Sequence, residues 1–125
     1  MVEVALILSV AIITFIGILD IGSVVFLIQG LTERARAGAR YGVVNTPFNA
    51  AKVQNVVVYG NSAGTGNPLL NLSSSVVTAT NPSFGDSVSA VQVVISGYQY
   101  HFYTPLISGN KTLPNIQVSL TQEGP

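Results

Sequence analysis

The chain has 125 residues, which is enough for one small domain or for a small domain plus a long helix. Five Lys and Arg residues balance five Asp and Glu residues, and only 8% of all residues are charged, which excludes a basic nucleic-acid-binding protein and an acidic solvating tail. Cysteine is absent, so the chain has neither a disulfide framework nor a thiolate metal site.

An almost unbroken apolar segment occupies residues 1–28 and contains only two formally charged side chains, Glu3 and Asp20. As a helix, residues 4–28 would extend about 37 Å at a rise of ~1.5 Å per residue, enough to cross a hydrocarbon core of about 30 Å with some tilt. The apolar side chains do not keep to one face, so lipid or other protein must surround the helix. We do not expect a cleaved signal peptide, because no Lys or Arg precedes the segment, the segment is too long, and no A-x-A site follows it.

Glu3 lies at the expected start of this helix, where the helix dipole favours negative charge. Its carboxylate can simply face the lipid headgroups. Alternatively, it can reach the N-terminal amine of a neighbouring helix that is offset along its axis, and an ion pair in such dry surroundings would set the offset between the two molecules.

Asp20 is harder to place, because an aspartate deep in a bilayer costs roughly 2.5–3.5 kcal/mol on insertion scales. Gly17 and Gly22 flank it, and each weakens a helix by about 1 kcal/mol relative to Ala. Asp20 can be protonated, bonded to freed backbone N–H groups, or paired with a cation from another chain. It can also mark the membrane surface, if the hydrocarbon segment ends near Leu19. The sequence does not choose between these alternatives.

The helix is expected to continue as an amphipathic segment and to end between Tyr41 and Val44, because Gly42 is a favourable C′ residue and Asn45-Thr46-Pro47 cannot easily continue a helix. Within it, small residues recur with i, i+3, i+4, i+7 spacing at Ala35, Gly38, Ala39 and Gly42. Such a stripe lets another backbone approach closely. It can receive a second molecule or pack under the chain's own domain, and the sequence leaves both interpretations open.

From residue 43 onward, apolar residues alternate with polar ones, which is typical of strands. We expect strands at residues 53–59, 75–80, 88–103 and 116–120, with a loop at residues 60–68. In the longest strand the shared face changes at Gly97, which predicts a bulge or bend. The residues before the glycine that share a face are Val91, Val93 and Ile95, and those after it are Tyr98, Tyr100 and Phe102. We expect the aromatic face to belong to the core rather than to an adhesive surface.

These elements predict an α+β fold. A long N-terminal hydrophobic helix, residues 1–42, precedes a small antiparallel β-rich domain, residues 43–125, which is exposed at the surface. About four antiparallel strands would lay one face against the C-terminal half of the helix, and a domain of this size buries only a modest core.

No pattern of catalytic or metal-binding residues is evident. His101 is the only histidine and Asp86 is the one acidic residue near it in the sequence, so we expect neither a metal site nor another cofactor. Residues 60–66 do not match the phosphate-binding loop and no serine lies in a nucleophile elbow, so we do not expect an enzyme. Asn71 and Asn110 match the N-x-[ST] acceptor pattern and are candidate glycosylation sites in surface loops.

The first 42 residues resemble the N-terminal region of TadE-like proteins, which are pilin-related proteins of tight-adherence (Tad) systems within the type IV pilin superfamily. The resemblance depends on Val2-Glu3-Val4-Ala5-Leu6, on Asp20-Ile21-Gly22 and on Ala35-Arg36-Ala37-Gly38-Ala39-Arg40-Tyr41. A less specific similarity covers the tail, where Tyr103-Thr104-Pro105-Leu106 precedes a Gly/Asn turn and a last strand.

This resemblance implies a pilin-like structural subunit. A prepilin peptidase would remove a short basic leader, and the chain would lie in the inner (cytoplasmic) membrane until the pilus assembly machinery adds it to an extracellular filament of identical subunits. Glu3 would correspond to the glutamate near the mature N-terminus of pilins and, with Asp20, would set the register of assembly. Candidate residues for helix–helix packing are Gly17, Gly22, Ala35, Gly38, Ala39 and Gly42.

Two other functions fit the same residues. The chain can be a minor pseudopilin that primes a filament made of another protein, a role that most members of the family are taken to have. It can also be a single-span membrane protein that anchors an extracytoplasmic binding domain. Membrane lipid is an expected partner in all three cases, and nucleic acid in none.

Overall fold

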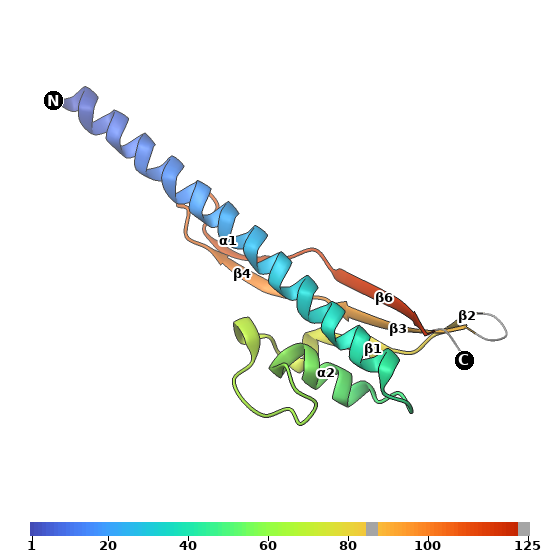
Figure 1. Ribbon diagram of the computed structural model, residues 1–125. Helices are drawn as coiled ribbons and strands as arrows, with labels where there is room; N and C mark the ends of the chain where they lie inside the picture. The colour runs from blue at the N-terminus through green and yellow to red at the C-terminus, as the bar shows by residue number, and fades with distance from the viewer. Residues whose placement is uncertain (85–87, 123–125) are drawn as a thin grey trace.

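A computed structural model describes residues 1–84 and 88–122 and has an α+β fold, as predicted. A long helix runs along one face of a small antiparallel sheet, and a second, short helix packs beside it (Figure 1). The elements, in chain order, are α1 (Val2–Val44), α2 (Ala50–Tyr59), the 3₁₀ turns η1 (Leu69–Asn71) and η2 (Ser74–Val76), and the strands β1 (Val77–Thr80), β2 (Ser83–Phe84), β3 (Val88–Ile95), β4 (Gln99–Phe102), β5 (Gly109–Thr112) and β6 (Ile116–Gln122).

Helix α1 continues without interruption from Val2 to Val44, so its predicted end is confirmed. The prediction that Gly42 ends the helix as its C′ residue is wrong, because Gly42 lies inside the helix and is buried. Asn45 caps the end of the helix, and its backbone N–H and side-chain Nδ2 both donate to the Tyr41 carbonyl, at 3.0 Å and 2.9 Å. These two bonds satisfy a carbonyl that would otherwise have no partner at the helix end.

Strand β3 is the centre of a four-stranded antiparallel sheet. One edge of β3 pairs with β6 along its length, with Val91 opposite Leu120. The other edge pairs with β1, where Val77 faces Ile95, and with the short β2. The last predicted strand is therefore confirmed, and the strand predicted at residues 75–80 is confirmed from Val77 onward, after the η2 turn.

The long predicted strand breaks at Gly97, as expected. Gly97 has φ +74°, a left-handed conformation that glycine adopts without steric cost. Before it, the three aliphatic residues that were predicted to share a face are buried against the helices. After it, β4 leaves the four-stranded sheet and forms a separate hairpin with β5, in which Tyr100 faces Lys111. The Gly/Asn turn that was expected after Tyr103-Thr104-Pro105-Leu106 corresponds to Gly109 and Asn110. Both residues lie in strand β5 instead.

The strand predicted at residues 53–59 is wrong, because these residues form helix α2. Val53 and Val57, four residues apart, both bury their side chains in the core. Asn49 caps the start of the helix, where its Oδ1 accepts from the Lys52 N–H at 3.1 Å. Gly60, in a left-handed conformation with φ +78°, ends it, and the predicted loop follows.

The core lies where the C-terminal half of α1, helix α2 and one face of the sheet meet (Figure 1). Helix α1 contributes Leu27, Leu31, Ala35 and Ala39, helix α2 contributes Val53, Val57 and Val58, and the sheet contributes Val77, Ala79, Val91, Val93 and Ile95. The second half of α1 is therefore part of the globular domain, and the first half projects beyond it.

Candidate functional site: the exposed apolar half of the first helix

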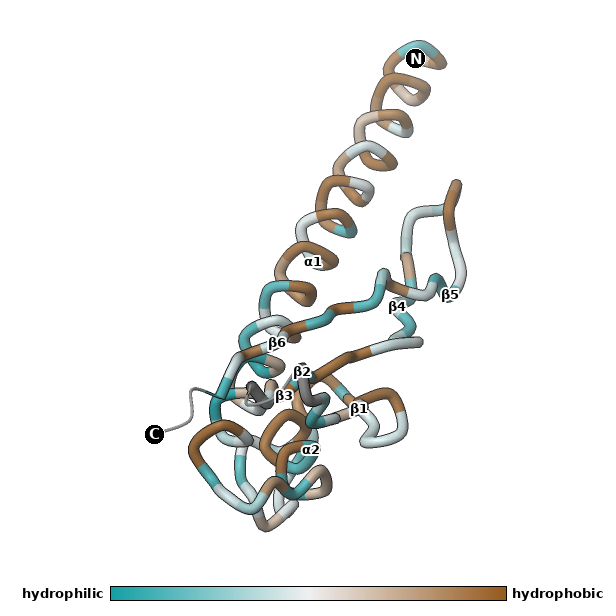
Figure 2. The backbone as a smooth tube through the Cα atoms, turned by 90° about the vertical axis from the view of Figure 1, so that its right-hand side faces the viewer, coloured by the Kyte–Doolittle hydropathy of each residue, from teal (hydrophilic) through white to brown (hydrophobic). Residues whose placement is uncertain are grey.

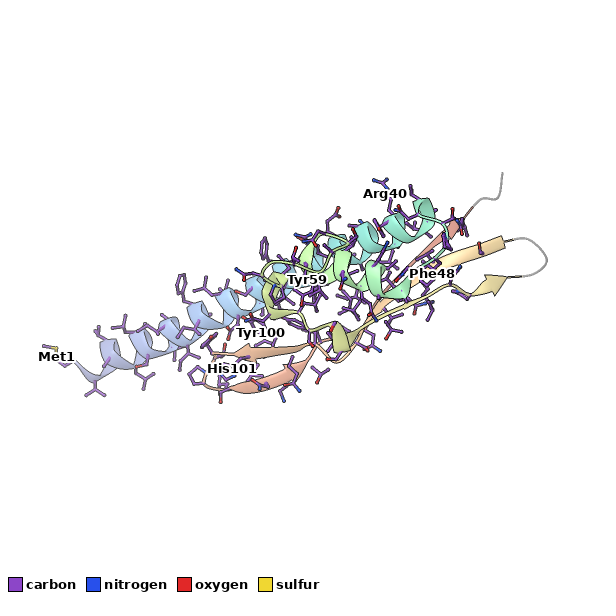
Figure 3. All side chains as sticks on the ribbon, turned by 90° about the horizontal axis from the view of Figure 1, so that it is seen from below. Met1, Arg40, Phe48, Tyr59, Tyr100 and His101 are labelled. Carbon is purple, nitrogen blue, oxygen red and sulfur yellow. The ribbon has the colours of Figure 1, made fainter. Side chains whose placement is uncertain are left out.

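The first half of α1, residues 2–19, exposes apolar side chains around most of its circumference, and only Ile13, Ile16 and Gly17 are half-buried. We call it the apolar half. Figure 2 shows it extending past the strands, and Figure 3 shows Met1 at its free end, far from the labelled residues of the domain. Most of its large hydrophobic side chains are between 51% and 80% exposed, namely Val2, Val4, Leu6, Ile7, Leu8, Val10, Ile12, Phe15, Ile18 and Leu19.

The apolar half is about 27 Å long at ~1.5 Å per residue, close to the hydrocarbon thickness of a bilayer. The helix to which it belongs is long enough and apolar enough to cross a membrane. Ser9 and Thr14 do not interrupt it, because their hydroxyls donate to the carbonyls of Ala5 and Val10 inside the helix, each at 2.8 Å. Such internal bonds allow a hydroxyl to lie in apolar surroundings.

The stripe of small residues in the second half of α1 packs against the chain's own domain. A Cβ added at Gly38 would collide with Val57 Cγ2 of α2. A Cβ at Gly42 would lie 2.8 Å from Val91 Cγ1 of β3 and 3.1 Å from Val53 Cγ2. Ala35 and Ala39 are likewise buried. Of the two interpretations that the sequence left open, the structure shows packing within the domain.

The two glycines around Asp20 have different surroundings. Gly17 lies beside the segment that follows β4, and a Cβ there would come to 4.0 Å from Thr104 Oγ1. Gly22 is exposed, and a Cβ there would meet nothing within 4 Å. It lies in an open, mostly apolar groove that is also lined by Ile18, Leu19, Phe26, Leu70 and Tyr100. Of the packing candidates, Gly22 is therefore accessible to a second molecule.

Asp20 marks the boundary between the two halves of α1 and is only 5% exposed. Its Oδ2 accepts from the backbone N–H groups of Tyr103 and Thr104, at 3.0 Å and 2.7 Å, and from the Thr104 hydroxyl. Hydrogen bonds from three donors stabilise the ionised form of a carboxylate. Of the predicted alternatives, bonding to backbone N–H groups is the one observed, and the N–H groups come from the segment after β4. We call this contact the Asp20 clamp.

Glu3 lies in the first turn of α1 and is exposed. The position at the helix start is as predicted, and the carboxylate is open to a second molecule. Because it is near the free end of the apolar half, its role in register concerns contacts between molecules and stays a prediction.

The hairpin beside α1 carries the only histidine of the chain. His101 Nδ1 lies 2.9 Å from Asn110 Oδ1, and its ring contacts Tyr103 edge to face at 5.1 Å between centroids. Figure 3 shows His101 and Tyr100 together on the hairpin, and Tyr100 lines the groove at Gly22 of α1. Within residues 1–84 and 88–122, no cluster of three or more His, Cys, Asp or Glu side chains is placed to hold a metal ion. Asp86, the acid that the sequence brought near His101, lies outside the described residues.

The two candidate glycosylation sites are exposed, but Asn110 lies in strand β5 rather than in a loop. Asn71 lies in the η1 turn with φ +55°. Tyr98, from the aromatic face, is half-buried, and its hydroxyl donates to the Leu70 carbonyl at 2.6 Å. Burial raises the pKa of Tyr98 above its ordinary value. Tyr98 and Tyr100 pack against the core, so the aromatic face belongs partly to the core, as expected.

Sequence reasoning missed Tyr103 and Thr104 as the partners of Asp20. The contact joins positions more than eighty residues apart, and only the tail segment Tyr103-Thr104-Pro105-Leu106 gave a signal, as part of a resemblance. Comparison with known proteins adds no partner or role, since no family model, no curated protein and no solved structure matches this chain.

Proposed function

We propose that this chain is the structural subunit of a type IV pilus-like filament of the tight-adherence kind, which assembles through its N-terminal helix. The observation that carries the proposal is the division of α1. One half is fixed in the core of a small domain, and the other half is apolar on all sides and exposed over most of its surface. Exposed apolar surface of this extent marks an interaction with lipid or with protein.

The physical basis of the proposal is that the apolar half exchanges lipid for neighbouring helices. A helix that is apolar all round is accommodated by acyl chains, and packing against identical helices gives it similar contacts. Leaving the bilayer for a filament core therefore carries little net hydrophobic cost. In this scheme the apolar half lies in the cytoplasmic membrane before assembly and in the core of an extracellular filament afterwards, and the β-rich domain faces water.

The structure limits which residues can form contacts between subunits. Ala35, Gly38, Ala39 and Gly42 are occupied by α2 and β3 of the same chain. Packing between helices in the proposed filament would therefore use the apolar half and the open groove at Gly22. Glu3, at the free end, would pair with the N-terminal amine of the next subunit and penalise a wrong axial offset, because an offset would leave a charge unpaired in dry surroundings.

The experiment compares Glu3→Ala with Glu33→Ala, since both glutamates are exposed on α1 but Glu33 lies in the half that belongs to the domain. We expect Glu3→Ala to insert in the membrane but to form no filaments. We expect Glu33→Ala to insert in the membrane and to form filaments. Normal filaments from Glu3→Ala would remove Glu3 from the mechanism.

Electron microscopy of the purified wild-type chain after detergent removal tests whether it polymerises alone. Filaments support a major structural subunit. Filaments that form only after a different pilin is added would make the chain a minor, priming pseudopilin. The proposal assigns the chain no catalytic role and no cofactor.

A further inference from the structure

We propose that the loop joining β4 to β5, residues 103–108, inserts into the lipid headgroup region beside α1 while the chain is in the membrane. We call this loop the hairpin tip. The inference rests on the membrane-inserted stage of the proposed function and adds to it a second, separate contact with the bilayer.

The hairpin tip is unusually apolar for a surface loop. Tyr103, Leu106 and Ile107 are 72%, 81% and 54% exposed, and residues 103–108 include no charged side chain. Single exposed hydrophobic residues are ordinary on protein surfaces, but a cluster on one projecting loop marks an interaction site. A tyrosine next to aliphatic residues is the composition favoured at a membrane interface, because its ring is apolar and its hydroxyl is polar.

The Asp20 clamp fixes where along α1 the hairpin tip lies. The Tyr103 and Thr104 N–H groups bond to Asp20, and Gly17, about one turn closer to the N-terminus, faces the Thr104 hydroxyl. The tip is itself folded back by the Ile107 N–H, which donates to the Thr104 carbonyl at 3.1 Å. Figure 2 shows the brown tip pointing in the same direction as the apolar half of α1.

The depth of the tip follows from the length of the helix. Residues 2–19 extend about 27 Å, so when they fill the hydrocarbon core, Asp20 lies at the membrane surface. Tyr103 and Thr104, at the start of the tip, are bonded to Asp20 and lie at this level, and the rest of the tip points from there toward the apolar half. Lipid is therefore the occupant that the geometry favours over a soluble protein partner.

The second contact would orient the domain. A single helix leaves the domain free to turn about the helix axis, whereas a helix and a tip together fix which face of the domain looks toward the membrane. Every subunit would then be presented to the assembly site in the same orientation.

The chain contains no tryptophan, so a single introduced tryptophan reports on its own surroundings. Three full-length variants are reconstituted into phosphatidylcholine vesicles, with and without brominated acyl chains. Leu106→Trp reports on the hairpin tip, and Phe15→Trp reports on the apolar half. Val44→Trp is the matched control, because Val44 is also apolar and 73% exposed but lies at the opposite end of α1.

We expect Leu106→Trp to show blue-shifted emission and a loss of intensity with brominated lipid that clearly exceeds that of Val44→Trp. If Phe15→Trp is quenched and Leu106→Trp behaves like Val44→Trp, the inference is wrong and the insertion of the helix stands. If Phe15→Trp is not quenched, the inserted stage of the proposed function fails and the inference fails with it. A blue shift at Leu106→Trp without quenching would mean that protein, and not lipid, covers the tip, and would also overturn the inference.

Discussion

Replacing Gly42 by alanine should destabilise the domain, although alanine is the better helix former. The added Cβ would lie 2.8 Å from Val91 Cγ1 and 3.1 Å from Val53 Cγ2, well inside the ~3.5–4.0 Å of an ordinary carbon–carbon contact. Both valines are fully buried and have stiff side chains, so neither can turn away. Overpacking of this kind costs about 1–3 kcal/mol. Helix propensity returns about 1 kcal/mol, so we expect the free energy of unfolding to fall by up to roughly 2 kcal/mol.

Gly30→Ala is the matched control, because it makes the same substitution in the same helix with room for the methyl group. Its Cβ would lie 3.7 Å from Leu70 Cδ1, an ordinary contact. We expect Gly30→Ala to raise the free energy of unfolding by up to ~1 kcal/mol. Thermal unfolding in detergent, followed by circular dichroism, should place the Tm of Gly42→Ala several degrees below wild type and that of Gly30→Ala at or above it. A Tm for Gly42→Ala equal to or above that of Gly30→Ala would refute the close packing of α1 on β3.

Two further predictions concern the division of α1 into two halves and the Asp20 clamp. Leu31→Ala, at a fully buried position, should lower the free energy of unfolding by about 2–5 kcal/mol. Leu6→Ala, in the apolar half, should leave the unfolding of the domain in detergent unchanged, and equal effects of the two variants in denaturant titrations would contradict the division of the helix. Asp20→Ala should accelerate hydrogen exchange at the Thr104 N–H while exchange in β3 is unchanged, and unchanged exchange at Thr104 would show that the clamp does not hold the hairpin tip.

Much of the fold follows from local signals in the sequence. The apolar run at the N-terminus predicts a helix that has no wet face, and the structure leaves most side chains of residues 2–19 exposed. The change of face at Gly97 predicts a break, and the glycine adopts the positive φ that a break requires. Period-two alternation at residues 116–120 predicts the last strand, which pairs with β3. In each case one strong local pattern agrees with the tertiary structure.

The short helix α2 shows where local patterns compete. The strand was predicted from alternating apolar and polar residues, and three consecutive valines also favour a strand by propensity. The capping residues Asn49 and Gly60, together with the four-residue spacing of Val53 and Val57, are the signals that indicate a helix. Packing of α2 against α1 then outweighs the weak preference of valine for strands.

The candidate site was less predictable, because its contacts join distant parts of the chain. The unusual position of Asp20 was evident, but its partners Tyr103 and Thr104 come from a hairpin whose place beside α1 is set only by the folded sheet. The small-residue stripe has the same spacing whether it faces its own domain or another subunit. Gly42 also illustrates this limit, since glycine can end a helix or permit close packing, and only the position of Val91 decides between the two.

The proposed exchange of lipid for neighbouring helices is tested most directly by asking where the intact chain is found on cells. Cells are sheared, the surface material that pellets is collected, and the chain and its N-terminal residue are identified in it by mass spectrometry. We predict that the chain with its complete apolar half is a principal component of this pelletable polymer. Finding the intact chain only in the detergent-solubilised membrane fraction, and never in the sheared material, would contradict the proposal and indicate a single-span membrane-anchored protein.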